Sequence, residues 1–480
     1  MHELPSRRLL TALMALHVLA WTLVPWLVNT SLPLDVVREG LSWGHEFAWG
    51  YHKHPPLPSW LVEISFRAFG TLGPYLLAQL TVMATLWLVW RIGCRLLDPA
   101  RALAGTLLLA GVPFFTWPSI EFNHNTAQMP LWALAMLLYL RVLKSDGWRD
   151  WMALAVVCAL GLYTKYAFLV LIALLSGHLL FSAPRRLFSL KGLGALLILL
   201  GLLTPHLQWL ASHDFQPLHY LGARSTRLHG ISAHLLATLY FAGVQALNML
   251  LPVLLWLALL YRHQRVTWPP ARLLLLALGP VALVTSLILL TGNTARPMWA
   301  TPMLSLTGLL LASLLPEPPA KRALQRLLIA ALLITFSVLG LYAAIGLAGE
   351  ASRHKPMRTG WPAAELSAAV TQAWSARTAC PLRIVAGENW LAGVAAYGMT
   401  PRPQVFIDED FSLSPWLTQE QVQREGLVRL SRTPQTSTSA TGPDEVQVKI
   451  SWPRTDRVEP LSVTLQIRPP ARPCLKDAST

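Results

Sequence analysis

The chain has 480 residues, of which 54% are hydrophobic and only 13% charged, and its mean hydropathy is +0.45. Because a soluble domain usually carries about 25% charged residues, this composition excludes a single soluble globular protein and predicts a membrane protein. A formal net charge of +15 would favour nucleic-acid binding in a soluble chain. Whether it does so here depends on where the basic residues lie along the chain. Four cysteines without a Cys-x-x-Cys pair exclude a disulfide scaffold and do not indicate a zinc site.

Apolar runs of spanning length follow one another from the N-terminus to about residue 348. A helix needs about 20 apolar residues to cross a bilayer, and eleven stretches come close to that length. The first resembles a signal peptide, but it is long, rich in tryptophan and lacks a small-residue cleavage site before Asn29, so we interpret it as a retained span. The predicted spans lie near residues 9–28, 74–93, 99–117, 125–143, 150–164, 166–183, 189–211, 234–261, 273–292, 298–315 and 324–348.

Lys and Arg residues are divided unequally between the two sides that alternate spans define. Of those in residues 1–348, 17 fall on the side of the N-terminus and 7 on the other. By the positive-inside rule the N-terminus is cytoplasmic, and the odd number of spans places the C-terminus outside. Topology therefore explains most of the basic excess, and we expect no nucleic-acid partner.

A change of composition near Gly349 marks the end of the transmembrane domain, residues 1–348, and the start of a second domain, residues 349–480. The second domain is rich in proline, threonine and charge and has no spanning run. Its pattern predicts a small extracytoplasmic α/β domain. Helical residues are predicted at 391–397 and strands at 381–385, 404–407, 446–450 and 461–467.

The predicted location of this domain outside the cytoplasm allows two of its cysteines to form a disulfide. Cys380 and Cys474 both lie where thiols oxidise, whereas Cys94 and Cys158 lie in or beside predicted spans. We therefore predict a Cys380–Cys474 disulfide, which contributes about 4 kcal/mol in the chain-entropy model.

Carboxylates are scarce in the outward loops of the membrane part, and four of the six lie in one long loop, residues 29–73. This loop is amphipathic, so we predict two helices lying on the membrane surface around residues 52–56. Asp35 and Glu39 are four residues apart and would lie on one helical face, where they could share a cation or a proton, or one could act as a base. A solvated helix face is an equal alternative. The six carboxylates are Asp35, Glu39, Glu46, Glu63, Glu121 and Asp214.

A cluster of basic side chains precedes two prolines in the segment Trp49-Gly50-Tyr51-His52-Lys53-His54-Pro55-Pro56-Leu57. Consecutive prolines end one helix and can open the next, so the His-Lys-His cluster would be presented at a helix N-terminus. Cationic groups and helix-terminal N–H groups together favour phosphate binding. The alternative is an interfacial cluster that binds lipid headgroups without chemistry.

Asp35, the Trp49–Leu57 segment and Trp60 together resemble the first extracytoplasmic loop of the GT-C glycosyltransferases. The group they resemble is related to protein O-mannosyltransferases and aminoarabinose transferases, and is called PMT/ArnT-like or family 39. Thr164-Lys165-Tyr166 is similar to an outward Lys-Tyr turn of this family, and Arg296-Pro297-Met298-Trp299 is similar to the loop before a late span. The resemblance covers roughly residues 1–348 and implies an all-α polytopic membrane fold with about 11 transmembrane helices.

The function that the resemblance implies is sugar transfer from a polyprenyl (undecaprenyl) phosphate carrier to a lipid, glycan or protein acceptor. The reaction would occur at the periplasmic face of the bacterial inner membrane. In such enzymes the acid in the position of Asp35 is the proposed base, and the basic pair before Pro-Pro contacts donor phosphate. The candidate catalytic residues are Asp35, Glu39 and Glu121; the candidate phosphate ligands are His52, Lys53, His54, Lys165 and Arg296; the candidate sugar or acceptor ligands are Tyr51, Asn123, His124 and Asn125.

Two positions depart from the family pattern. Asp35 is followed by Val36 where many members have a second acid, and the loop that often carries another Asp reads Glu121-Phe122-Asn123-His124-Asn125-Thr126. Either Glu121 substitutes for that acid, or the asparagines of this loop bind the sugar as neutral hydrogen-bonding groups.

No cofactor is required by a sequence motif, although the carboxylates Asp35, Glu39 and Glu121, with His124, have the chemistry to bind a divalent cation such as Mg or Mn. Neither a P-loop nor a G-x-G-x-x-G motif occurs, which disfavours a nucleotide-sugar donor. The alternative function is a lipid-linked sugar flippase or transporter, which would place its charges at bilayer mid-depth in paired broken helices. The acids here lie in outward loops, which favours the enzyme. The sugar, the acceptor and the oligomeric state are not specified by these patterns.

Overall fold

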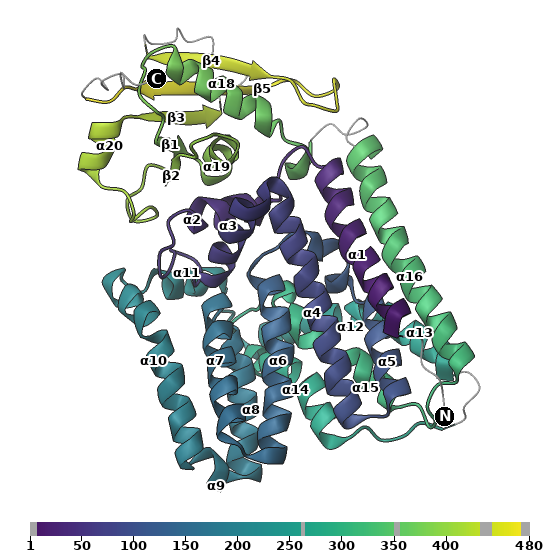
Figure 1. Cartoon of the computed structure of the whole chain (residues 1–480). Helices are drawn as coiled ribbons and strands as arrows, with labels where there is room; N and C mark the ends of the chain where they lie inside the picture. The colour runs from purple at the N-terminus through teal and green to yellow at the C-terminus, as the bar shows by residue number, and fades with distance from the viewer. Residues whose placement is uncertain (1–6, 261–264, 350–355, 433–443, 472–480) are drawn as a thin grey trace. The chain divides into compact units, whose positions relative to one another are not determined.

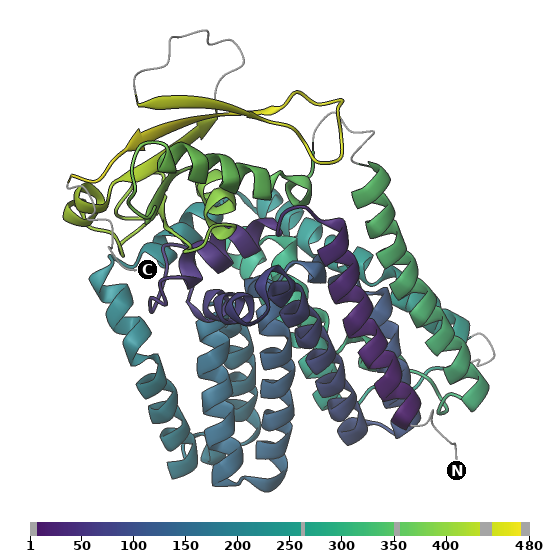
Figure 2. The same cartoon turned by 45° about the horizontal axis from the view of Figure 1, so that its top comes forward.

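The computed structural model describes residues 7–260, 265–349, 356–432 and 444–471. These residues are mainly helical, with a five-stranded sheet near the C-terminus (Figures 1 and 2). Packing divides the chain into two compact units. The first comprises Met1–Thr22, Lys53–Pro58 and Tyr75–Gly340, and the second comprises Leu23–His52, Ser59–Pro74 and Leu341–Thr480. Most of the first outward loop is thus grouped with the C-terminal residues, whereas composition alone places the domain boundary at residue 348.

The predicted fold class, a polytopic helical membrane part followed by a small α/β part, is confirmed. Each of the eleven predicted spans coincides with helical residues, and six described helices are long and apolar enough to cross a membrane, or eight if two bent pairs each count as one span. One pair bends by 92° just before Pro113, because the residue before a proline is extended. The helices of this part are α1 Arg7–Val28, α4 Gly73–Leu96, α5 Pro99–Leu108, η3 Leu109–Gly111, η4 Pro113–Phe115, η5 Trp117–Ile120, α6 His124–Ser145, α7 Trp148–Thr164, α8 Phe168–Ser182, α9 Pro184–Leu187, α10 Leu190–Ser212, α11 Gln216–Arg224, α12 Ile231–Asn248, α13 Leu250–Leu260, α14 Ala271–Thr291, η6 Pro297–Leu304, α15 Thr307–Ser313, α16 Lys321–Ala344 and η7 Ile345–Gly349.

The core of the first unit includes the contacts among α6, α7 and α8. Trp132 and Phe168 are completely buried, and their rings meet edge to face with centroids 5.4 Å apart. Gly161 on α7 leaves room for the Phe168 ring, because a Cβ at that position would lie 2.4 Å from it. In contrast, Leu197 on α10 and Leu236 on α12 are 70% and 71% exposed. Large exposed apolar side chains on long helices suit a lipid environment.

The sheet of the second unit has the strand order β2-β1-β3-β5-β4. β1 is parallel to β2 and β3, whereas β5 is antiparallel to β3 and β4. Alternate residues of β5 are buried from Leu461 to Ile467, because successive side chains point to opposite faces and α18 packs against this strand. The strand β3, which was not predicted, joins the parallel and antiparallel parts. The elements are η8 Arg358–Gly360, α18 Ala363–Ser375, β1 Ile384–Gly387, α19 Asn389–Tyr397, β2 Gln404–Ile407, α20 Gln419–Glu425, β3 Leu427–Arg432, β4 Glu445–Ile450 and β5 Leu461–Arg468.

The loop of residues 29–73, predicted to face outward, forms short helices, and its first part packs on α19 within the second unit. A Cβ at Gly393 would lie 2.9 Å from the Ser42 hydroxyl oxygen, so α19 and this segment approach closely. The Asn389 side chain donates a hydrogen bond to the Arg38 carbonyl at 3.3 Å. The loop is therefore held by protein contacts. Its elements are the π-helical η1 Val36–Leu41, α2 Ser42–Gly44, α3 Leu57–Phe69 and η2 Gly70–Leu72.

Candidate active site

Asp35 and Glu39, the predicted acid pair, lie at the start of the first outward loop in the second unit. Asp35 immediately precedes η1 and is half-buried, whereas Glu39 is 8% exposed. The Glu39 carbonyl accepts a hydrogen bond from Ser59 Oγ at 2.7 Å, which ties η1 to α3. Because Glu39 is buried, the alternative of a solvated helix face is wrong for this residue. The catalytic role of the pair stays a prediction.

A buried carboxylate anchors α3 of this loop to the C-terminal residues of the second unit. Glu63 accepts hydrogen bonds from Arg402 and from Arg67 Nε, the latter at 2.6 Å, and His45 Nδ1 lies 3.8 Å from its carboxylate. The Glu63 side chain is completely buried. Sequence patterns identified Glu63 only as an outward carboxylate, and no local pattern marked Arg402.

Glu46 adds a second polar link between the same two parts of the chain. Gln404 Nε2, on β2, donates a hydrogen bond to Glu46 Oε2 at 2.7 Å. Oε1 of the same carboxyl group is buried without a hydrogen-bond partner among the described residues. Burial raises the pKa of Glu46, although the hydrogen bond from Gln404 opposes the shift.

Tyr51 and His52 of the basic segment belong to the second unit and pack on Trp43. The Tyr51 ring is 1% exposed and stacks on Trp43 with centroids 5.2 Å apart, and His52 meets Trp43 edge-on at 5.1 Å. Burial raises the pKa of the Tyr51 hydroxyl group. These contacts position both residues, while their predicted roles toward sugar and phosphate stay predictions.

Lys53 and His54, which follow directly, belong to the first unit. The His54 and His124 rings lie with centroids 4.1 Å apart, so a predicted phosphate ligand and a predicted sugar ligand meet. Tyr220 of α11 lies beside both basic residues, with its ring centroid 6.0 Å from the His54 ring and 5.7 Å from Lys53 Nζ. The sequence patterns did not single out Tyr220. Arg224, four residues later, donates from Nε to the Tyr220 hydroxyl at 2.7 Å, and this spacing within one helix could have pointed to the contact.

Lys165 and Asn125 form a polar pair at the ends of α7 and α6. Lys165 is only 9% exposed, and its Nζ donates a hydrogen bond to Asn125 Oδ1 at 2.6 Å. The same Nζ lies 5.4 Å from the Trp299 ring centroid. Asn123 caps α6, because its side chain accepts from the backbone N–H groups of Asn125 and Thr126 at 2.9 and 3.2 Å. The cap orients the first turn of α6 and hence Asn125.

The remaining predicted site residues, Glu121 and Arg296, each lie just before a helix. Glu121 is half-buried just before the Asn123 cap, and its carbonyl accepts from Thr126 Oγ1 at 3.3 Å. Arg296 is exposed and directly precedes η6, which carries Trp299. Glu121 belongs to the first unit and the Asp35–Glu39 pair to the second, so a cation bound by all three acids stays a prediction.

Cys380, in the second unit, is disulfide-bonded. Its predicted partner, Cys474, lies outside the described residues. Trp374 Nε1 donates to the Cys380 carbonyl at 2.6 Å, so the residue is also held by its surroundings. Cys94 and Cys158, which lie in or beside predicted spans, are free thiols.

Comparison with known proteins identifies the fold. Residues 53–209 match the family model for dolichyl-phosphate-mannose-protein mannosyltransferases, while no curated protein matches the sequence. A crystal structure of ArnT from Cupriavidus metallidurans bound to undecaprenyl phosphate is similar with a TM-score of 0.62 at 13% identity, over 96% of this chain and 98% of that chain. The apo structure of the same protein has a TM-score of 0.62 at 12% identity, over 95% and 97%. The chain therefore has the ArnT fold over nearly its whole length, and the resemblance to PMT/ArnT-like glycosyltransferases is confirmed.

Proposed function

We propose that this protein is a membrane glycosyltransferase that moves a sugar from a polyprenyl-phosphate carrier to a lipid, glycan or protein acceptor. The observation that carries the proposal is the buried side chain of Lys165, whose ammonium donates to Asn125 Oδ1 at 2.6 Å and lies 5.4 Å from the Trp299 ring centroid. A buried charge is costly unless it is paired and hydrogen-bonded, and the contact with Asn125 supplies one such hydrogen bond. An ammonium held in this way is suited to attract the phosphate of a donor.

The proposed reaction is a displacement at the anomeric carbon. The acceptor oxygen attacks this carbon while its proton passes to the Asp35 carboxylate, which acts as the general base. The bond from the anomeric carbon to the phosphate oxygen breaks, and the electron pair stays on the phosphate. Lys165, Arg296 and Lys53 stabilise the charge that develops there. Single displacement predicts inversion at the anomeric carbon.

The membrane setting supports a lipid-linked donor. ArnT from Cupriavidus metallidurans, whose fold this chain shares, is seen bound to undecaprenyl phosphate, and we propose a carrier of this class here. The distribution of Lys and Arg supports a cytoplasmic N-terminus. Transfer would then occur at the periplasmic face of a bacterial inner membrane, with the C-terminal residues on that side.

The test is mass spectrometry of envelope lipids and glycans from cells that produce the wild type or the variant Asp35→Asn. We expect one sugar addition to fall by about 10²–10⁴-fold in the variant, the usual contribution of a general base. Asp214→Asn, which changes an exposed outward carboxylate in the same way, should leave the addition intact. Full transfer by a normally inserted Asp35→Asn protein would contradict the proposal.

A further inference from the structure

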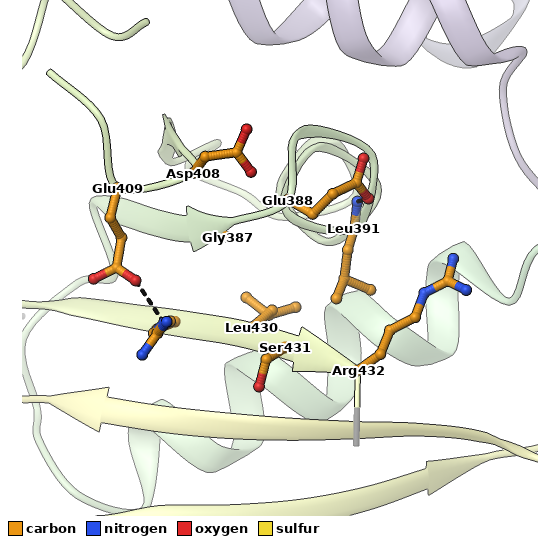
Figure 3. A pocket seen from close by; sticks show the side chains of 9 residues that line it. Gly387, Glu388, Leu391, Asp408, Glu409, Leu430, Ser431 and Arg432 are labelled. Atoms are coloured by element: carbon orange, nitrogen blue, oxygen red, sulfur yellow. Dashed lines mark hydrogen bonds and ion pairs between the residues drawn. The ribbon is translucent and has the colours of Figure 1, made fainter. Parts of the chain in front are cut away.

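A cavity of about 340 Å³ lies at the carboxyl end of the parallel strands in the second unit (Figure 3). The neighbouring strands β2, β1 and β3 are parallel, and β1 lies between the other two. The chain leaves β1 through α19 toward β2 on one side, whereas β3 lies on the other side. In open α/β sheets, ligands bind where the connections that follow two adjacent strands run to opposite sides, because a crevice forms there. The cavity lies at that point.

One part of the cavity wall consists of acidic side chains. Glu388 caps α19, with Oε2 accepting from the Leu391 N–H at 3.2 Å. Asp408 and Glu409 directly follow β2 (Figure 3). The Glu409 carboxylate pairs with Arg429 Nε at 2.5 Å, so its charge is largely balanced within the wall.

The other part of the wall comes from the end of β3 and supplies donors. Ser431 and Arg432 line the cavity there (Figure 3). The Arg432 guanidinium lies over the Trp361 ring, 5.0 Å from its centroid, which restricts the orientation of this long side chain. The end of β3 therefore adds a guanidinium group to a wall that also carries carboxylates.

Charge selects the chemical class of ligand. An anion would meet the carboxylates of Glu388 and Asp408, and a cation would meet the guanidinium groups of Arg429 and Arg432. A neutral molecule with several hydroxyl groups satisfies both parts, because each hydroxyl can donate to a carboxylate and accept from a guanidinium group. A volume of about 340 Å³ is at the small end of ligand pockets, which span about 300–1,000 Å³.

We propose that this cavity binds the ring of a neutral saccharide, held by Glu388 and Asp408 as acceptors and by Arg432 as a donor. Binding here is independent of the transfer reaction proposed above. The variant Asp35→Asn should therefore keep it, so that failure of one proposal is distinguishable from failure of the other.

The test is saturation-transfer NMR on the full-length protein in lipid nanodiscs, with free glucose, galactose, mannose, arabinose and N-acetylglucosamine as probes. We expect saturation of the ring protons of at least one sugar. Asp408→Asn and Arg432→Ala should each weaken its binding about tenfold, since each removes a charge-assisted hydrogen bond. Asparagine tolerates the positive φ of residue 408, so this variant keeps the backbone.

The matched control is Arg424→Ala, which removes an exposed guanidinium on α20 outside the cavity. It should bind the sugar as the wild type does. The proposal is overturned if none of the five sugars receives saturation, or if Asp408→Asn and Arg432→Ala both bind as the wild type does. It is also overturned if the two variants abolish binding of inorganic phosphate or Ca²⁺ while leaving the sugar signal unchanged.

Discussion

Arg402 donates through one guanidinium nitrogen to both carboxylate oxygens of Glu63, a residue 339 positions earlier in the chain. The Glu63 side chain is completely buried and that of Arg402 is 12% exposed, so the ion pair is shielded from water. It joins α3 of the first outward loop to the segment before β2. The loop that carries Asp35 thus folds as part of the same unit as the C-terminal sheet, and we infer that C-terminal residues help to position the proposed base.

Removal of this anchor should destabilise the second unit. In Arg402→Ala, Glu63 keeps Arg67 but loses its buried partner, and breaking a buried ion pair costs about 3–5 kcal/mol; we expect roughly 3 kcal/mol. Thermal unfolding of the purified protein measures the effect. Arg383→Ala removes an arginine that is 63% exposed and 3.5 Å from Glu425, and should change stability by less than about 0.5 kcal/mol. Equal melting temperatures for the two variants would contradict the anchor.

The raised pKa of Glu46 predicts a pH dependence of stability. Burial favours the neutral carboxyl group in the folded state. The contribution of Glu46 to the free energy of unfolding is therefore complete below the ordinary glutamate pKa. That contribution is lost as pH rises through the raised folded pKa. Glutamine is always neutral, so in Glu46→Gln the free energy of unfolding should depend less on pH above about pH 4.5. The variant should also be more stable than the wild type at neutral pH. A variant with the wild-type pH profile would show that Glu46 is not responsible.

Lys165 should contribute to transition-state stabilisation in the proposed transfer. Lys165→Gln keeps a polar side chain near Asn125 but removes the charge, and loss of one group that stabilises a developing anion reduces kcat by about 10²–10³-fold. Transfer from a purified lipid-linked donor measures the loss. Lys191→Gln is the control, since Lys191 pairs with Asp146 at 3.1 Å and has no predicted role in catalysis. Unchanged kcat in Lys165→Gln would remove Lys165 from the site.

The Asn123 cap should act on activity through position. Asn123→Ala removes the acceptor for the backbone N–H groups of Asn125 and Thr126, at about 1 kcal/mol of stability. The first turn of α6 would loosen, so we expect lower kcat because Asn125 no longer orients Lys165. Asn123→Ser restores a good capping group and should recover most of the activity. If serine does not rescue the alanine defect, Asn123 itself contacts the substrate, which is the role that its sequence position predicts.

Much of the membrane part could be predicted because its signals are local. Hydropathy alone predicts the apolar helices α4, α6 and α10, and Pro113 explains the bend after α5. Within the site, Lys165 and Asn125 were both predicted as ligands, yet their 2.6 Å contact was not foreseen. Nothing in the sequence around either residue states how the ends of α6 and α7 meet.

Local sequence patterns predicted only part of the second unit. Its antiparallel strands alternate in burial and were predicted, whereas β3 was missed although it lies at the centre of the sheet. Arg402 was missed as well, because a single arginine in a polar segment has no periodic pattern. Its significance depends on a buried carboxylate elsewhere in the chain.

Composition, hydropathy and the distribution of charge were enough to predict a polytopic helical membrane protein, whose fold is confirmed, and a short set of ionisable groups in the loops between its apolar helices. These are properties of residues and their near neighbours, and the free energy of burying apolar surface depends on them directly. Only the tertiary structure decided that Glu39 is buried, that Arg402 pairs with Glu63, and that the ends of three strands enclose a polar cavity. Such features arise from packing between distant segments, which leaves no trace in local sequence.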